Sequence, residues 1–502
     1  MVLKQAKIEK RLFTKPTANL LRAMAVVSPL ALSACQSFVD LAADPSLSPS
    51  KSPVIAENVR SGRLARLGAA QHPRILETYG GEYSNVALER MVAGIVGKLV
   101  TVSDNPTQVY QISILDSPVV NAFALPGGYL YVSRGLLALA SDSAELAAVI
   151  AHEMAHVTSN HGILRQKREK ENVLAERIVS DVLRDKEAGR RALVRGKLDL
   201  AQFSRNQELE ADAVGIAAIG EAGYDPYAAA AFQQRMAAFN AYRSASGADD
   251  QGIDFLSTHP STPQRVALAV GHARKFGGRG TGTRDRESYM RGVNGMLFGD
   301  SADEGYVRSQ RYSHVGLGIT FEFPDGFDIE NRPEAVLGGR QSDGAAIRFD
   351  GDDLPQNASL TEYIASGWVE GLDVSSVRAA SINGLEAATA KASVGRWDFD
   401  VTVVRANGAV YRILTAAPSG SSELTSLANK VRSSFRVLSK AEKAELKPLR
   451  IRILKAEAGD TVASMAARMR DVSNAQTLFR VLNGVPEGEE PEAGKLYKIV
   501  TQ

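Results

Sequence analysis

The sequence predicts a multidomain protein in which a mainly α-helical domain with a small β-sheet precedes an α+β domain and a small α/β module. Its 502 residues are too many for one ordinary core, which favours two to four domains. Hydrophobic residues make up 44% and charged residues 23%, the balance of globular proteins. The net charge of +2 argues against a nucleic-acid partner, which would call for a strong basic excess.

The N-terminal residues are typical of a bacterial export signal. A basic leader between Lys4 and Arg22 precedes a short apolar run and small residues that end at Cys35, the single cysteine. Leu32–Cys35 resembles a lipobox, which predicts that the signal peptide is removed and that Cys35 carries lipid in the membrane. A buried or incidental thiol is the alternative. Gln36 stands where an aspartate would favour the inner membrane, so we expect the outer membrane.

Composition and periodicity divide the chain into five segments. Residues after Cys35 are rich in Ser, Pro, Ala and Asp, which predicts a flexible tether. Beyond about residue 313 short strands alternate with helices, as in a separate α+β domain. The predicted segments are a lipoprotein signal peptide (1–34), a tether (35–60), a helical domain (61–290), an α+β domain (313–440) and a small module (450–502).

Apolar spacing assigns the elements of the first domain in order. A turn signal at Pro126–Gly128 separates two strands, and Asp142 with Glu145 forms a possible capping pair for the next helix. The charge-dense stretch 165–197 predicts an amphipathic helix whose basic residues form a solvated face, with a membrane patch as the alternative. We expect helices at 87–102, 144–157, 165–197 and 198–219, and strands at 109–115, 121–125 and 129–133.

The α+β domain shows no catalytic constellation, and we assign it no function. A charged linker is predicted at 440–447 before the last module. We expect strands at 317–323, 345–349, 399–404 and 410–415, and helices at 360–371 and 424–435.

His152-Glu153-Met154-Ala155-His156 is an H-E-x-x-H motif on a predicted helix. Histidines at i and i+4 lie on one face, so both imidazoles can reach one ion, which indicates one zinc per chain. Glu153 projects from the adjacent edge, where it can act as a general base without competing as a ligand. Zinc needs a third protein ligand, and Glu208 on the next strong helix can supply it. Asp212, one turn later, can accept a hydrogen bond from a ligand imidazole.

Three segments in this order resemble a zinc metallopeptidase family. Asn121–Gly128, the H-E-x-x-H motif and Glu208–Asp212 are similar to the family of HtpX and the CAAX prenyl endopeptidases, in its soluble BepA-like branch, over about residues 60–276. The resemblance implies a zincin-type (gluzincin) peptidase domain with Glu208 as third ligand. It also implies an edge strand to which an extended peptide would add, formed by Tyr129, Leu130, Tyr131, Val132 and Ser133.

Two further histidines have to be weighed beside the motif. His161 follows His156 by five residues, which does not fit the longer H-E-x-x-H-x-x-G-x-x-H pattern, and we expect a structural role. His259 precedes Pro260, as in the His-Pro loop of BepA-like relatives, where the histidine fills the open position of zinc and silences the enzyme. Stabilisation of the oxyanion and a bystander role are the alternatives.

The last module resembles a LysM module at 458–462, 482–484 and 493–499. That resemblance implies binding of N-acetylglucosamine glycans such as peptidoglycan, and a structural appendage is the alternative.

Taken together, the resemblances imply a lipid-anchored zinc endopeptidase of the bacterial cell envelope, held in the periplasm at the outer membrane. Its expected substrates are misfolded or misassembled envelope proteins. One alternative is an assembly or chaperone-like binding factor whose zinc site is mostly shut. Another is a peptidoglycan-associated hydrolase that uses the same zinc.

Overall fold

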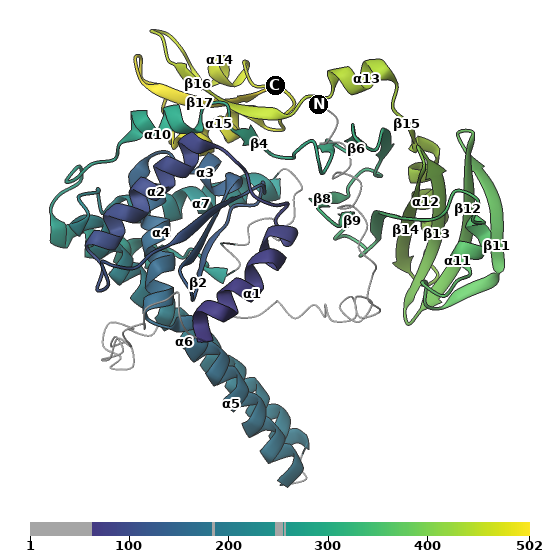
Figure 1. The fold of residues 1–502 in the computed structure, drawn as a ribbon, viewed down its shortest axis with the longest axis horizontal. Helices are drawn as coiled ribbons and strands as arrows, with labels where there is room; N and C mark the ends of the chain where they lie inside the picture. Colours follow the sequence, from purple (N-terminus) through teal and green to yellow (C-terminus); the bar gives the residue numbers. More distant parts are fainter. Residues whose placement is uncertain (1–62, 183–185, 246–254, 256–257) are drawn as a thin grey trace.

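The computed structural model describes residues 63–182, 186–245, 255 and 258–502. The expected signal peptide (1–34), Cys35 and the tether (35–60) lie outside the described residues. A helical domain, a β-rich region and a small α/β unit follow one another along the chain (Figure 1), in agreement with the multidomain prediction. Within the described part of the chain, no helix combines the length and apolar character needed to cross a membrane.

The first domain surrounds a three-stranded sheet with helices. The predicted helix at 87–102 is confirmed within one residue, and Asp142 caps α4 by accepting a hydrogen bond from the Glu145 amide. Its elements are α1 (Arg63–Thr78), α2 (Val86–Thr101), β1 (Gln111–Leu115), β2 (Ala122–Leu125), β3 (Tyr129–Ser133), α3 (Arg134–Leu139), α4 (Ser143–Thr158), α5 (His161–Val182), α6 (Lys186–Glu221), α7 (Ala228–Ala245), α9 (Pro263–Ala273), η6 (Arg274–Phe276) and α10 (Arg286–Val293).

The sheet has the strand order β1-β3-β2, so β3 is its central strand. β3 pairs with β1 in parallel and with β2 antiparallel, and both of its edges are therefore occupied. The expectation that Tyr129–Ser133 forms the edge strand for a peptide is wrong, because a strand paired on both sides has no free backbone ladder. β2 is an edge strand, and it packs beside α4.

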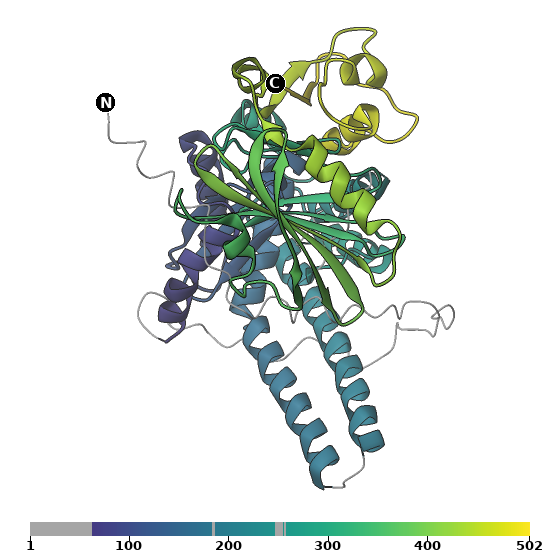
Figure 2. The same ribbon diagram turned by 90° about the vertical axis from the view of Figure 1, so that its right-hand side faces the viewer.

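Helices α5 and α6 form a hairpin that projects from the body of the molecule (Figures 1 and 2). α6 runs without interruption from Lys186 to Glu221, so the predicted division at residues 197 and 198 is wrong. Its C-terminal part packs against α4 and carries the predicted acidic residues into the domain. The hairpin is thus rooted beside the H-E-x-x-H helix.

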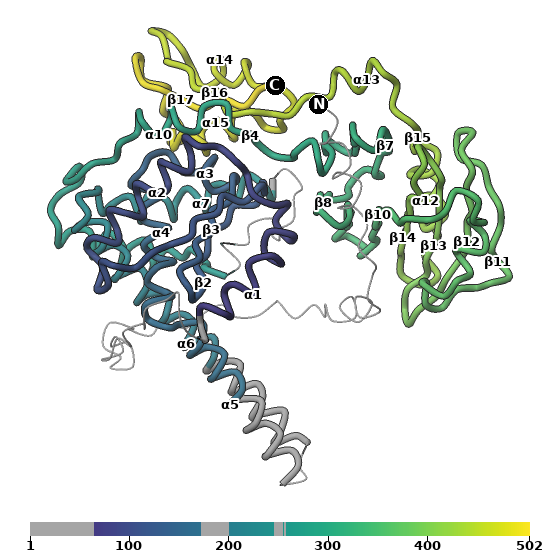
Figure 3. Tube along the Cα trace, in the orientation of Figure 1, coloured from purple at the N-terminus to yellow at the C-terminus, as the bar shows by residue number. Residues whose placement is uncertain are grey.

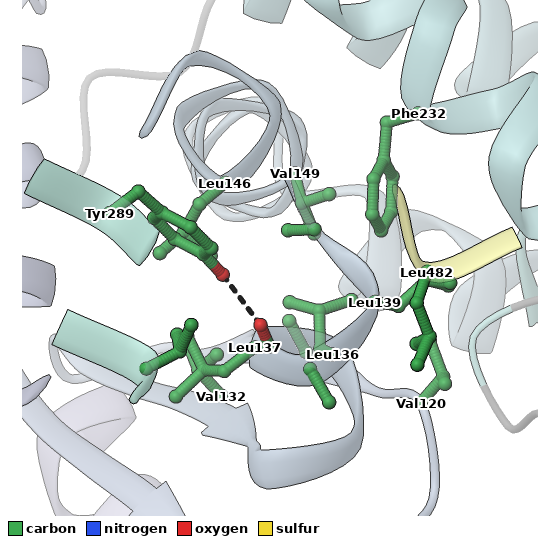
Figure 4. Close-up of a cluster of buried hydrophobic side chains, with 14 of the residues drawn as sticks. Val120, Val132, Leu136, Leu137, Leu139, Leu146, Val149, Phe232, Tyr289 and Leu482 are labelled. Carbon is green, nitrogen blue, oxygen red and sulfur yellow. Dashed lines mark hydrogen bonds between the residues drawn. The ribbon is translucent and has the colours of Figure 1, made fainter. Parts of the chain in front are cut away.

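The core of the first domain gathers around α3 and α4 (Figure 4). Leu136, Leu139 and Val149 pack there with Phe232 of α7. The Tyr289 hydroxyl of α10 donates a 2.7 Å hydrogen bond to a carbonyl at the C-terminal end of α3, where helical carbonyls lack partners (Figure 4). This packing fixes α4, the helix that carries the H-E-x-x-H motif.

The β-rich region contains a seven-stranded antiparallel sheet of order β11-β12-β13-β14-β10-β9-β8 and a four-stranded sheet of order β15-β7-β6-β5. The helix predicted at 360–371 ends at Ile364, and the linker predicted at 440–447 contains a short capped helix. The elements are β5 (Tyr306–Arg308), β6 (Arg311–His314), β7 (Ile319–Glu322), β8 (Asp328–Arg332), β9 (Ala335–Gly339), β10 (Ala346–Asp352), α11 (Leu360–Ile364), β11 (Leu372–Ile382), β12 (Leu385–Val394), β13 (Trp397–Ala406), β14 (Ala409–Pro418), α12 (Leu424–Ser434), β15 (Arg436–Val437) and α13 (Lys440–Glu445).

The C-terminal unit shares its hydrophobic core with the first domain. Its three-stranded sheet, of order β17-β16-β4, takes β4 from the chain that follows α10. Leu482 lies in one buried cluster with Leu139 of α3 and Phe232 of α7 (Figure 4). Figure 3 shows the chain path that returns from the β-rich region to this unit. The elements are β4 (Leu297–Phe298), β16 (Leu449–Lys455), α14 (Val462–Ala466), α15 (Ala475–Asn483) and β17 (Leu496–Thr501).

Candidate metal centre

The centre begins on α4, which is buried along most of its length. His152 and His156 lie one turn apart on this helix, and their Nε2 atoms are 3.0 Å from each other. The side chain of His152 is 7% exposed and that of His156 is 16% exposed. The two imidazoles therefore point into one buried space, as the i, i+4 spacing requires.

Glu208 of α6 completes this space. Its Oε1 is 3.3 Å from His156 Nε2, and its Oε2 is 3.4 Å from His152 Nε2. Gly215, two turns further along α6, faces the backbone of α4: a Cβ at this position would lie 3.0 Å from the His152 nitrogen. The absence of a side chain at Gly215 lets the two helices approach closely enough for the carboxylate to reach both imidazoles.

His259 enters the same space from the segment before α9. Its Nδ1 is 3.0 Å from both carboxylate oxygens of Glu208 and 3.3 Å from His152 Nε2. In the described part of the chain, one atom from each of His152, His156, Glu208 and His259 lies within 4.8 Å of the others. Imidazole nitrogens and a carboxylate oxygen that converge in a buried space fit a zinc ion.

Asp212 and Arg265 lie against these side chains. Asp212 Oδ1 is 3.0 Å from His152 Nδ1, the position expected for the acceptor that orients this imidazole. Arg265 of α9 binds both oxygens of Asp212, at 2.7 and 2.8 Å, and its Nη1 lies 3.0 Å from Glu208 Oε2. Arg265 also donates to the Pro260 carbonyl. Sequence reasoning missed Arg265, because an arginine on an amphipathic helix gives no local sign of burial.

The pKa values of the two histidines shift in opposite directions. Burial lowers the pKa of His152, but hydrogen bonds to Asp212 and Glu208 outweigh it and raise the pKa to about 10. Burial lowers the pKa of His156 to about 3, against the opposite effect of Glu208. Although burial raises the pKa of Glu208, hydrogen bonds from the imidazoles hold it well below its usual range. Burial raises and Arg265 lowers the pKa of Asp212, which settles at about 2. The imidazole of His152 and the guanidinium of Arg265 thus both lie against the carboxylates of Glu208 and Asp212.

Glu153 lies beside the cluster of His152, His156, Glu208 and His259 without belonging to it. It is 3% exposed, and its Oε1 has no hydrogen-bond partner among the described residues. His259 Nε2 lies 3.6 Å from that oxygen. Burial raises the pKa of Glu153, while His259 and His152 lower it. A buried carboxylate oxygen with a free acceptor site is suited to take a proton from a reacting molecule.

His161 and Glu210 also reach the centre. His161, the first residue of α5, places its Nδ1 2.9 Å from His156 Nδ1. Its Nε2 is 3.6 Å from Glu210 Oε2. Apart from the five-residue spacing, no sequence pattern pointed to this contact, because the two histidines lie on different helices.

The fold and the site define a metallopeptidase domain. Residues 86–272 match Peptidase family M48, and this segment contains the H-E-x-x-H helix, Glu208 and His259. The curated relatives named below are metalloendopeptidases or proteases, which supports the same class of enzyme for this domain. The prediction of a metallopeptidase is confirmed at this level.

Three curated relatives are similar to part of this chain. Mitochondrial metalloendopeptidase OMA1 of Schizosaccharomyces pombe is 31% identical over 35% of this chain and 50% of its own length. The Arabidopsis thaliana protein of the same name is 33% identical over 32% of this chain and 30% of its own length. Beta-barrel assembly-enhancing protease of Yersinia pestis is 28% identical over 41% of this chain and 42% of its own length. The chain thus spans half or less of each relative.

A solved structure also aligns with part of the chain. The solution structure of cyanobacterial PsbP from Synechocystis covers 28% of this chain at 17% identity. Its TM-score of 0.22 is too low to support a shared fold.

Proposed function

We propose that this chain is a zinc-dependent endopeptidase of the gluzincin type, with one zinc held by His152, His156 and Glu208. The observation that carries the proposal is the buried convergence of two Nε2 atoms and a carboxylate, with pairwise distances of 3.0 to 3.4 Å. Catalytic zinc sites use three such ligands and keep a fourth position open. The match of residues 86–272 to a peptidase family supports peptide bonds as the target.

Each group at the centre has a role in peptide hydrolysis. Zinc in this position would polarise the scissile carbonyl and make water more acidic. Glu153 takes the proton of the attacking water on its free Oε1 and delivers it to the leaving amine. Asp212 accepts from His152 Nδ1 and keeps its Nε2 directed at the ligand space.

An extended substrate would add to β2 rather than to the central strand β3. β2 is an edge of its sheet and lies beside α4, which carries Glu153. An edge strand offers free backbone donors and acceptors, so a peptide can bind largely independently of its sequence. Such recognition suits a protease that acts on unfolded segments.

His259 controls access to the centre. Its Nδ1 is within 3.3 Å of both Glu208 and His152, which favours its acting as a further ligand over a bystander role. An imidazole there would compete with water for the open position, so basal activity would be low. On this basis His259→Ala should raise hydrolysis of an unfolded protein at unchanged zinc content. A fall of one or more decades would instead assign His259 to oxyanion stabilisation.

We assign the enzyme to the bacterial cell envelope, with misfolded or misassembled envelope proteins as substrates. One basis is the lipobox-like sequence at Cys35, which predicts a lipid anchor and a periplasmic site at the outer membrane. Another is the similarity to a protein named for β-barrel assembly. Binding of peptidoglycan through the C-terminal unit rests on the LysM resemblance alone. Unchanged membrane fractionation of Cys35→Ser would refute the anchor.

A binding or assembly factor is the second candidate function. It is favoured by the contacts of His259, which would leave the centre mostly shut. In this case substrates would bind beside α4 without being cut. The peptidoglycan hydrolase alternative has no specific observation at the centre in its favour.

Glu153→Gln tests the proposal. An amide cannot accept the proton at neutral pH, but the ligands stay in place. We expect about one zinc per chain in both proteins and loss of hydrolysis of an unfolded protein in the variant. Glu287→Gln, a change at a largely exposed glutamate of α10, is the matched control and should keep full activity. Equal turnover by Glu153→Gln and wild type would refute Glu153 as the base, and wild-type protein without zinc would refute the metal assignment.

A further inference from the structure

His161 is brought to the ligand His156 by a tight connection between two helices. α4 ends at Thr158 and α5 begins at His161. Between them Asn160 adopts a positive φ of 54°, a conformation that asparagine tolerates better than most residues. The turn folds α5 back, so that the His161 imidazole lies against the side of His156 that faces away from Glu208.

The 2.9 Å separation of the two Nδ1 atoms constrains where the hydrogens lie. One nitrogen must donate and the other must accept. His156 Nε2 faces His152 Nε2 and Glu208, and it can bind a cation only through its lone pair. In a neutral imidazole the hydrogen is then on His156 Nδ1, which donates to His161 Nδ1.

The environment of His161 supports this orientation. Its own hydrogen is then on Nε2, which is buried, lacks a hydrogen-bond partner within 3.5 Å among the described residues and faces Glu210 Oε2 at 3.6 Å. Gln207 of α6 donates to the His161 carbonyl at 3.0 Å and holds the start of α5 in place. His161 is 4% exposed, so water does not readily replace it as the acceptor.

We propose that His161 is a positioning residue for the metal centre: its Nδ1 accepts the hydrogen of His156 Nδ1 and thereby fixes the tautomer and ring orientation in which His156 Nε2 binds metal. Glu210 orients His161 in turn. This inference rests on the proposed metal site. The two ligand imidazoles thus have different supports, a carboxylate for His152 and a second imidazole for His156. Removing a hydrogen-bond acceptor of this kind commonly weakens metal binding about 10- to 100-fold. We expect a loss of the same order when His161 no longer accepts from His156.

A pair of isosteric variants separates this role from packing. His161→Asn keeps an acceptor oxygen near the place of Nδ1. The leucine of His161→Leu has nearly the same shape as this asparagine but offers no acceptor. Zinc affinity is measured on the full chain by competition with a chromogenic chelator, and the ligand field by the visible spectrum of the cobalt-substituted protein. We expect His161→Leu to bind zinc about 10- to 100-fold more weakly, with an altered cobalt spectrum, and His161→Asn to stay within about threefold of wild type.

Two results would overturn the inference. Wild-type zinc affinity in a folded His161→Leu variant would show that the hydrogen bond is dispensable. Equal losses in the Leu and Asn variants would show that only the shape or ring of His161 matters. If the Leu variant does not fold, the Asn variant decides alone, because a loss above tenfold contradicts the proposal and near-wild-type affinity supports it. Metal affinity is read without turnover, so failure of the peptidase proposal would appear separately, as an inactive wild-type protein that still binds zinc.

Discussion

At the residue scale, Arg265 is the side chain that holds the acidic part of the centre together. It is 7% exposed and contacts the carboxylates of Asp212 and Glu208 as well as the Pro260 carbonyl. Buried carboxylates need a paired cation, because desolvation otherwise costs several kcal/mol. Arg265 thus stabilises Asp212 as an acceptor and anchors the segment that carries His259.

Arg265→Leu should destabilise the metal-free protein by about 3–5 kcal/mol, because it leaves buried carboxylates without their cation. Adding Asp212→Asn should recover part of this loss, since one of the uncompensated charges is removed. Urea unfolding of the metal-free single and double variants measures both effects. A single variant as stable as wild type would contradict the importance of this ion pair.

The convergence of His152, His156 and Glu208 could be predicted from sequence, but its surroundings could not. His152 and His156 lie on a helix that was predicted from its capping pair, and their i, i+4 geometry follows from the helix itself. The contacts of Arg265 and His161 depend on how α9 and α5 return to α4, which no local pattern encodes. A role for Asp212 was expected from its spacing, and it does contact His152.

At the element scale, the approach of α6 to α4 decides whether the ligands meet. Gly215→Ala would place a Cβ 3.0 Å from the His152 nitrogen and 3.2 Å from the Ala151 carbonyl carbon. Backbone atoms cannot move aside as a side chain can, so the helices should separate slightly. We expect weaker zinc binding, by several-fold or more, and no gain in stability despite the better helix propensity of alanine.

Gly97→Ala is the matched control for Gly215→Ala. Gly97 lies in the middle of α2, and its Cβ would meet nothing within 4 Å. Alanine should stabilise the protein there by up to about 1 kcal/mol without changing zinc affinity. Thermal unfolding and chelator competition on both variants check the pair, and identical behaviour would show that the close approach at Gly215 has no consequence.

Sequence patterns predicted some helices of this protein but not the pairing of its strands. Apolar periodicity located α2 and a capping pair located α4. The expectation, taken from the family resemblance, that 129–133 is an edge strand failed because strand order depends on pairing across the sheet. β12 was missed because four of its buried residues are alanines, which carry little strand signal. Those residues are Ala387, Ala388, Ala390 and Ala392.

At the scale of the whole molecule, the C-terminal unit is part of the catalytic domain's core. Lys498 is fully buried, and its Nζ donates to the carbonyls of Ala138 and Ala140 at 2.6 and 2.8 Å. Arg235 links Glu145 of α4 to the Val481 carbonyl of α15. The unit therefore completes the packing behind the H-E-x-x-H helix.

Deletion of residues 449–502 should destabilise the first domain, because it exposes the apolar core around α3 and leaves buried carbonyls without donors. We expect a protein that is protease-sensitive and loses zinc binding. Lys498→Met is the finer test, with an expected cost of about 1–3 kcal/mol for the carbonyls that lose their partner. A truncated chain with an unchanged unfolding transition would make the unit a dispensable appendage.

The junction between the first domain and the β-rich region contains a pH-sensitive carboxyl group. The side chain of Glu304 lies against Gly80 of the first domain. A Cβ added to Gly80 would be only 2.5 Å from the Oε1 of Glu304. Burial raises the pKa of Glu304 to about 8, and the charges of Asp300 and Asp116 add to this effect while Arg134 opposes it. The folded protein therefore keeps a proton on Glu304 at pH values where an unfolded chain has lost it.

The contribution of Glu304 to stability should consequently fall as pH rises from about 4.5, the ordinary pKa of the carboxyl group, to about 8, its value in the folded state. In that window Glu304 holds its proton in the native state and has lost it in the unfolded state, so through this group raising the pH favours unfolding. Glu304→Gln keeps the shape but cannot ionise, and it should flatten this dependence and be more stable than wild type above pH 8. Glu370→Gln, at an exposed position, is the control and should follow the wild-type curve. Urea unfolding at a series of pH values gives the difference between the curves, and parallel curves for Glu304→Gln and wild type would rule out Glu304 as the responsible group.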